Sequence, residues 1–287
     1  MTVVWSGLGI GAVYALVALM FNVVLAGSNV FNFAQPQFIM VGAFVGYLGL
    51  GENDFPLPLV ILAAGALGAV LGLLEDRIAI TPLKDREGNQ ALVTTVGWAV
   101  MLQGLALVIW ESNPRRVPYP LEGTNVDLFG GRVAALDLTL IGLAIAVGVG
   151  LHLINRRTEW GLASRAATAD PEAAALRGVD VVALRRTSFA VAGALSCAIG
   201  TIIGAKLTAN TGLGNDLLIL GFTALAVGGF GVYLGALAGG LLIGVIQQLT
   251  SFYLGSKYEL LVLFGVLLLV LLARPSGIFG RGTARSV

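Results

Sequence analysis

Long apolar stretches, separated by short polar segments, make up almost the whole chain. A bilayer core about 30 Å thick requires roughly 20 apolar residues per spanning helix, and such windows recur along the sequence. The predicted spans are 4–26, 38–50, 57–74, 91–110, 138–154, 187–207, 217–229, 232–249 and 258–273. Because 38–50 and 217–229 are too short to cross untilted, we expect an all-α polytopic membrane protein with eight or nine transmembrane helices and broken or re-entrant segments near 29–50 and 217–231.

The first break contains an unusual group of polar residues. The stretch NVFNFAQPQF, residues 29–38, combines four side-chain amides with a proline. Pro36 removes a helical donor and biases Gln35 away from helix, and amides can satisfy the opened backbone. Lipid does not tolerate such groups, so they face protein or a wet cavity. We predict that a path for a polar or zwitterionic solute is lined by Asn29, Asn32, Gln35, Pro36 and Gln37. The alternative is that 29–37 is a cytoplasmic turn.

The second break lies in ALAVGGFGVYLGALAGG, residues 224–240. Gly228, Gly229 and Gly231 interrupt an otherwise apolar run there. The two breaks could be equivalent parts of an internal repeat, since each is a short apolar segment beside an irregular turn. Repeats of this kind often place a transport path at their interface, so we predict that these glycines also line the path.

The distribution of charge predicts the orientation. Only 11% of the residues are charged, against about 25% in soluble domains, and the net charge of +1 does not indicate nucleic-acid binding. Twelve of the seventeen Lys and Arg residues fall in three segments, and such residues favour the cytoplasmic side. These are Arg77, Lys84 and Arg86, the six arginines from Arg156 to Arg186, and Arg274, Arg281 and Arg285. The N-terminus is therefore expected outside and the C-terminus in the cytoplasm.

The chain lacks the residues that would supply its own chemistry or driving force. The centres of the predicted spans carry no Asp, Glu, Lys or His, which coupled carriers usually keep within the bilayer. The sequence also has no G-x-x-x-x-G-K-[ST], H-E-x-x-H or G-x-S-x-G motif. We expect a protein that is not an enzyme, with no catalytic residue, metal site or bound cofactor.

Two segments outside the spans have a predicted structure of their own. TNVDLFGGRVAAL, in the longest outer loop, alternates around Gly130 and Gly131 as a hairpin does, and could either dock a partner or be simply solvated. The loop 155–186 contains DPEAAALRG, in which Asp170 is a good N-cap, Pro171 suits the first helical position, and Gly178 can close the helix.

The predicted two-turn helix is too short to be stable without an outside surface. A helix of small side chains can seat in a groove of another protein, and the alternative is a capped surface helix that joins two spans. The expected docking residues are Asp170, Pro171, Glu172, Ala173, Ala174, Arg177 and Gly178.

These segments resemble a known family. EAA at 172–174, followed by Gly178, resembles the EAA loop of ABC-importer permeases. GLGIGAVYALVAL and NFAQPQFIMVGAF resemble the branched-chain amino acid permeases of the LivH/LivM type, and FTALAVGGFGVYLGALAGGLLIG and LLARPSGIFGR are similar to the final third of that family. The likeness covers nearly the full length.

The resemblance implies that residues 1–287 form a single transmembrane permease domain in a bacterial plasma membrane, with 155–186 as its coupling loop. The partners would be a like or related second permease, two ABC ATPase subunits that hold the ATP, and an extracytoplasmic solute-binding protein. ATP-driven closure of the ATPases would pull on the helix from Pro171 to Arg177 and switch the path between outward and inward openings.

The chain departs from the family where His and Gly usually follow NFA, because it has Gln35 and Pro36 there. The later part of the EAA pattern is also absent. Branched-chain amino acids are the default cargo, although members of the family also carry urea, short amides and small carboxylates. The alternative function is a stand-alone channel or facilitator for a small neutral solute such as urea or an amide.

Overall fold

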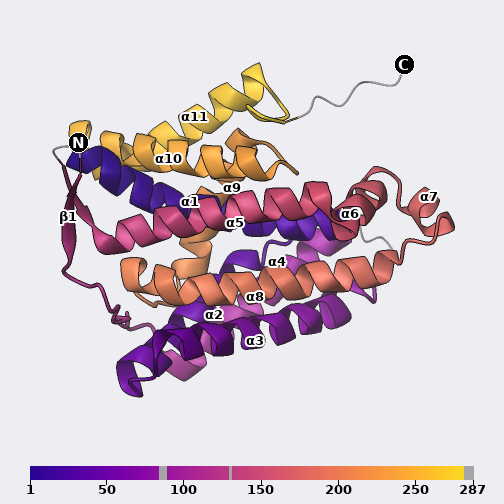
Figure 1. Ribbon diagram of the computed structural model, residues 1–287, viewed down its shortest axis with the longest axis horizontal. Helices are drawn as coiled ribbons and strands as arrows, with labels where there is room; N and C mark the ends of the chain where they lie inside the picture. Colours follow the sequence, from indigo (N-terminus) through magenta and orange to yellow (C-terminus); the bar gives the residue numbers. More distant parts are fainter. Residues whose placement is uncertain (84–88, 129–130, 281–287) are drawn as a thin grey trace. The chain divides into compact units, whose positions relative to one another are not determined.

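The computed structural model describes residues 1–83, 89–128 and 131–280 (Figure 1). Each predicted span is a helix, which confirms the all-α polytopic fold. The helices at the predicted spans are α1 (Thr2–Ser28), α2 (Gln35–Gly46), α3 (Leu57–Glu75), α4 (Asn89–Trp110), α5 (Ala135–Arg157), α8 (Val181–Leu207), α9 (Leu213–Gly228), α10 (Tyr233–Tyr253) and α11 (Glu259–Ala273). In the described part of the chain, seven helices are long and apolar enough to cross a membrane.

The two spans predicted to be short are short helices, although α11, with 15 residues, is also short. Helix α2 has 12 residues and α9 has 16, which at 1.5 Å per residue gives lengths of about 18 Å and 24 Å. A π-helical segment, η1 (Tyr47–Glu52), extends α2, and a second one, η2 (Asp76–Ile80), extends α3. A 3₁₀ turn, η3 (Ser256–Tyr258), precedes α11.

The loop between α4 and α5 forms the predicted hairpin. Strands β1 (Asn125–Leu128) and β2 (Gly131–Ala134) pair antiparallel, with Val126 opposite Val133. Parts of two predictions lie outside the described residues: Gly130 of the hairpin turn, and Lys84, Arg86, Arg281 and Arg285 of the orientation count.

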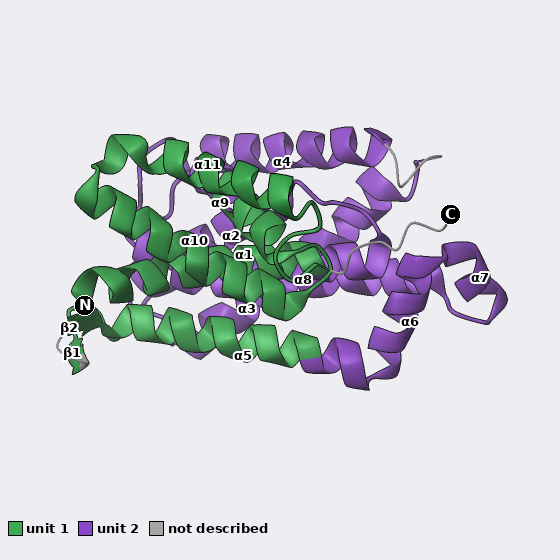
Figure 2. Ribbon diagram, turned by 90° about the horizontal axis from the view of Figure 1, so that it is seen from above, with its two compact units in different colours: residues 1–22, 120–152, 219–287 green, residues 23–119, 153–218 purple. Residues whose placement is uncertain are grey.

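The chain divides into two compact units (Figure 2). Unit 1 comprises Met1–Asn22, Pro120–His152 and Ile219–Val287, and unit 2 comprises Val23–Tyr119 and Leu153–Leu218. Helices α1, α5 and α9 each contribute residues to both units. The prediction of a single domain stays a prediction.

In unit 2, small residues allow α2 and α3 to pack closely against α8. A Cβ added to Gly68 would overlap the carbonyl of Gly193, and one added to Gly42 would overlap that of Cys197. Close backbone approach through glycine is a common way to associate helices in lipid. Cys197 is fully buried, and its Sγ contacts the carbonyl oxygen of Phe38 at 3.0 Å. These contacts align the start of α2 with the middle of α8.

In unit 1, close backbone approach through glycine likewise packs α1 against α10. A Cβ on Gly240 would overlap the backbone of Ala15, and one on Gly244 would overlap Gly11. Two helices have mostly exposed apolar side chains: α11 of unit 1 is almost wholly exposed, and α4 of unit 2 is largely so. Such surfaces are expected where a helix faces lipid.

Candidate functional site

The first break lies at the N-terminal end of α2. Helix α1 ends at Ser28, Asn29 has a positive φ of 55°, and α2 begins at Gln35 with Pro36 in its first turn, where no backbone donor is needed. The Nε2 of Gln35 donates to the carbonyl of Ala192 at 3.0 Å and to Ser196 Oγ at 2.6 Å. Because these partners lie near the middle of α8, helix α2 starts at mid-height of that span.

A buried amide network follows the break. Asn32 Nδ2 donates to Glu75 Oε2 at 2.8 Å and lies 3.3 Å from Gln35 Oε1, while Asn32 Oδ1 accepts from the backbone N–H of Ala34 at 2.8 Å. Asn32, Gln35 and Glu75 are all buried. The amides therefore hold the opened backbone and a carboxyl group together inside unit 2.

The sequence analysis missed Glu75. It ended the third span at residue 74, whereas the membrane span continues through η2 to Ile80 and includes Glu75 and Asp76. The analysis therefore missed a buried carboxyl near the end of α3, away from the span centres to which its expectation of no charge applied. The apolar run from Ile78 to Ile80 was the signal that the span continues past these two acids.

Asn29 and Gln37, at the two ends of the first break, have contacts outside this network. Asn29 is half-buried and lines a cavity of about 130 Å³ together with Pro171 of the loop 155–186. Gln37 is buried, and its Nε2 donates to Asn215 Oδ1 on α9 at 2.9 Å. The first break thus touches both the coupling loop and the start of the other short helix.

The second break belongs to unit 1 and is capped by residues 278–279. Gly229 and Gly231 have φ values of 112° and 72°, a region that only glycine enters easily. The backbone N–H of Gly231 donates to Asn22 Oδ1 at 2.8 Å. The last carbonyls of α9, those of Val227 and Gly228, accept from the N–H groups of Ile278 and Phe279 at 2.9 and 3.2 Å. The sequence predicted the break but not this capping segment.

Replacing Gly231 with alanine should isolate the cost of its backbone conformation. A Cβ there would meet nothing within 4 Å, so the left-handed φ alone should lower the free energy of unfolding by about 1–2 kcal/mol. Gly142→Ala is the matched control, since Gly142 lies within helix α5 and also has open space around it. Thermal unfolding of the two purified variants gives a midpoint temperature for each. Equal midpoints for Gly231→Ala and Gly142→Ala would contradict the prediction.

The coupling loop contains the predicted two-turn helix. Helix α6 (Glu159–Ala169) leads to α7 (Pro171–Leu176), and Asp170 Oδ1 caps α7 by accepting from the N–H of Ala173 at 3.0 Å. Gly178 closes the helix with a φ of 90°, and the N–H of Val179 reaches the carbonyl of Ala174 at 3.1 Å. The prediction of a capped helix between Asp170 and Gly178 is confirmed.

Helix α7 has one face on the protein and the rest exposed. Ala174 is buried against Ala167 of α6 and Leu184 of α8. Glu172, Ala173 and Arg177 are exposed, so they are free to meet a partner. Leu176, which the sequence analysis did not single out, is 90% exposed, the highest fraction among the described large hydrophobic residues.

Two sets of contacts attach the coupling loop to the spans. The hydroxyls of Ser164 and Thr168 on α6 both donate to the carbonyl oxygen of Ala26 near the end of α1, the latter at 2.9 Å. These bonds satisfy one of the last carbonyls of α1, which would otherwise lack a helical partner. Movement of α6 would therefore pull directly on the segment that enters the first break.

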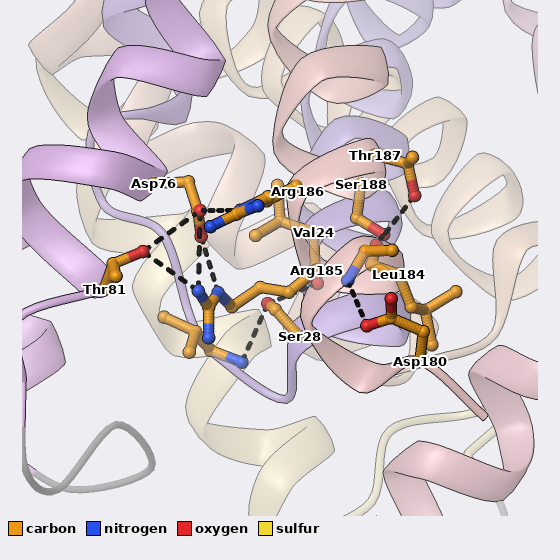
Figure 3. A network of polar contacts seen from close by, with 12 residues as sticks. Val24, Ser28, Asp76, Thr81, Asp180, Leu184, Arg185, Arg186, Thr187 and Ser188 are labelled. Atoms are coloured by element: carbon orange, nitrogen blue, oxygen red, sulfur yellow. Dashed lines mark hydrogen bonds and ion pairs between the residues drawn. The ribbon is translucent and has the colours of Figure 1, made fainter. Parts of the chain in front are cut away.

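The second attachment is a buried ion pair between α8 and the end of the α3 span (Figure 3). Arg185 Nε donates to Asp76 Oδ1 at 2.5 Å, and Arg185 Nη2 donates to Thr81 Oγ1 at 3.0 Å. The side chains of Arg185 and Asp76 are only 6% and 1% exposed. Arg186 lies 3.8 Å from Asp76 Oδ2 but is 55% exposed. The sequence analysis counted both arginines only as markers of orientation.

The fold and the site together define a polytopic helical membrane protein of the transporter class. Polar groups lie at mid-height of its spans, and a short exposed helix extends from a loop. Residues 3–271 match the family described as branched-chain amino acid transport system / permease component, and the chain belongs to this family. The resemblance noted in the sequence is thereby confirmed.

Relatives of known name cover nearly the whole chain. The high-affinity branched-chain amino acid transport system permease protein BraD of Pseudomonas aeruginosa is 29% identical, over 98% of this chain and 96% of its own. The corresponding LivH of Escherichia coli is 27% identical over 99% and 96%. The ribose import permease protein RbsC of Escherichia coli is 28% identical over 74% of this chain and 67% of its own.

A solved structure shares the fold. "PsaBC from Streptococcus pneumoniae in complex with Fab" superposes with a TM-score of 0.51 at 9% identity, over 94% of this chain and 91% of that one.

Proposed function

We propose that this chain is the membrane permease subunit of a binding-protein-dependent ABC importer that moves branched-chain amino acids. Family membership and the names of BraD and LivH support the cargo class. The observation that carries the coupling role is α7, a capped helix with an apolar tip at Leu176. Outside the lipid, an exposed aliphatic side chain of this kind can serve as an anchor in an apolar pocket of another protein.

A continuous series of contacts within unit 2 leads from α7 to the first break. Ala174 of α7 packs on Leu184, and the next residue, Arg185, is paired with Asp76. Asp76 follows Glu75, which accepts from Asn32 in the break. A displacement of α7 by an ATPase would thus move the start of α8 and the end of α3 together. Tightly packed elements of this kind shift as discrete bodies, which suits a switch between two openings.

The path itself is proposed to run along the two breaks, through Asn29, Asn32, Gln35, Pro36 and Gln37 in unit 2, and Gly228, Gly229 and Gly231 in unit 1. The amides of the first break are at mid-height of α8, a depth at which transporters place their solute sites. The burial of Asn32 and Gln35 means that these two act chiefly by holding the broken backbone in shape.

The partners proposed for this permease are two ATPase subunits that bind and hydrolyse ATP, a second permease, identical or related, and an extracytoplasmic solute-binding protein. The location is a bacterial inner membrane, with the N-terminus outside and the C-terminus inside. The excess of Lys and Arg in the loops at 77–86 and 155–186 supports this orientation. The β1–β2 hairpin then lies on the outer side, where the binding protein would dock.

Reconstitution separates this proposal from the alternative of a stand-alone facilitator. Proteoliposomes that contain only this chain should show no leucine or urea flux above empty liposomes, because the importer requires ATPase subunits and a binding protein. Adding those partners and internal ATP should start leucine uptake. Flux through the chain alone would support the facilitator, and a permease complex that never retains an ATPase would contradict the importer.

A further inference from the structure

A connected group of amides crosses from α2 through α9 to α4. Gln37 Nε2 donates to Asn215 Oδ1 at 2.9 Å, and Asn215 Nδ2 donates to Gln103 Oε1 at 3.2 Å. Gln103 Nε2 donates in turn to the carbonyl of Thr211 at 3.0 Å, just before α9 begins. We call Gln37, Asn215 and Gln103 the amide chain. All of these residues belong to unit 2.

The amide chain lies at mid-height of the spans rather than at their ends. Gln103 stands seven residues before Trp110, the end of α4, which is about 10 Å along the helix. Gln37 is two residues from Gln35, which is bonded to Ser196 near the centre of α8. Helices α2 and α9 thus both begin within the membrane, with their N-terminal ends linked by Gln37 and Asn215.

Part of the amide chain lies at the surface of the protein. Asn215 and its neighbour Asp216 are exposed, although the flanking α4 residues Val100 and Leu105 are exposed and apolar, as a lipid-facing surface requires. Asp216 is the acidic residue in the first turn of α9, and no cation pairs with it among the described residues. The helix N-terminus favours a carboxylate, but by several times less than a charge costs at the bilayer centre. Asp216 therefore requires water or a cation beside it.

Gln37 supplies a second, independent sign of a ligand. It is 1% exposed, and its Oε1 accepts no hydrogen bond from any residue that the structure describes. The atom lies against the start of α9, where a Cβ on Gly214 would overlap it. Buried acceptors are normally satisfied, so this oxygen is placed to receive a donor from outside the described chain.

We propose that Asp216 and Gln37 Oε1 form the contact for the ammonium group of a zwitterionic amino acid during its passage. A carboxylate and an amide oxygen are both acceptors, and together they favour an N–H-rich cation over a neutral solute. The amide chain holds the two broken helices in register around this contact. The inference rests on the proposed importer function and assigns the solute contact to the start of α9.

Cysteine labelling tests whether this surface faces water and solute. The native Cys197 is fully buried, so within this chain an introduced cysteine will dominate the reaction with a charged methanethiosulfonate reagent, and labelling is read on this subunit alone. In the importer complex in proteoliposomes, Asn215→Cys should react at least about tenfold faster than the control Val108→Cys, an exposed apolar position on α4. Saturating L-leucine should slow the reaction. A rate no greater than that of the control, or no protection by leucine, would overturn the proposal.

Uptake by Asp216→Asn tests the ammonium contact. This near-isosteric change at an exposed residue should lower L-leucine uptake at least about tenfold while the ATPase subunits stay bound. Asp54→Asn, at another exposed aspartate, should leave uptake unchanged. Unchanged uptake in Asp216→Asn would refute the contact and leave the importer intact. If the unmodified complex fails to move leucine at all, the importer proposal itself is wrong, and labelling still reports whether the surface is wet.

Discussion

Replacing Leu176 with aspartate is expected to reduce ATP-driven uptake by more than tenfold while the permease stays folded in the membrane. Leu176 is 90% exposed at the tip of α7, so its loss removes little internal packing. A carboxylate at that position would have to be desolvated in an apolar pocket of the ATPase without a partner, which costs several kcal/mol. Leucine uptake in proteoliposomes and the amount of ATPase that co-purifies should fall together.

Leu121→Asp provides the matched control for this change. Leu121 is also an exposed leucine outside the spans, but it lies in the loop before α5, whereas α7 follows α5 along the chain. That variant should retain the full complement of ATPase. If Leu176→Asp also binds the ATPase and transports normally, α7 does not dock through its apolar tip, and the coupling role assigned to it fails.

Replacing Arg185 with methionine is expected to destabilise the permease by about 3–5 kcal/mol, because the Asp76 carboxylate is left buried without its partner. Arg186→Met removes the same charge from the neighbouring position, yet its side chain is 55% exposed and lies farther from Asp76. Exposed ion pairs contribute about 1 kcal/mol at most to stability. The Arg186→Met variant should therefore unfold at a temperature close to that of the original protein. Thermal unfolding in detergent compares the two.

A double variant distinguishes a buried charge from a lost contact. Combining Arg185→Met with Asp76→Leu removes both charges and keeps apolar volume, so most of the lost stability should return. Equal unfolding midpoints for Arg185→Met and Arg186→Met would contradict the assignment. Failure of the double variant to recover would show that Thr81 and the local packing, rather than the charge of Asp76, depend on Arg185.

The features predicted most closely from sequence are those set by neighbouring residues. The caps of α7 are the best case, since Asp170, Pro171 and Gly178 act within a few positions of the backbone groups that they terminate. The short lengths of α2 and α9 were also predicted from the sequence, because the length of an apolar run directly limits the distance that a helix can cross.

The features that the sequence left unpredicted depend on partners far along the chain. The predicted third span stopped before Glu75 and Asp76, because charged residues without a known partner end an apolar window. Asn32 and Arg185, which make these acids tolerable in the interior, come from other elements. The same reasoning placed Asn215 and Asp216 outside the seventh span, although both belong to α9.

The sequence by itself determined that this is a multi-span helical membrane protein with two interrupted segments and a capped two-turn helix. Those properties follow from the length of apolar runs and from local backbone chemistry. Only the tertiary structure decided which polar groups meet: Asn32 with Glu75, Arg185 with Asp76, and Gln37 with Asn215. The physical reason is that a polar side chain buried in a membrane protein is stable only beside its partner, and the packing of separate helices chooses that partner.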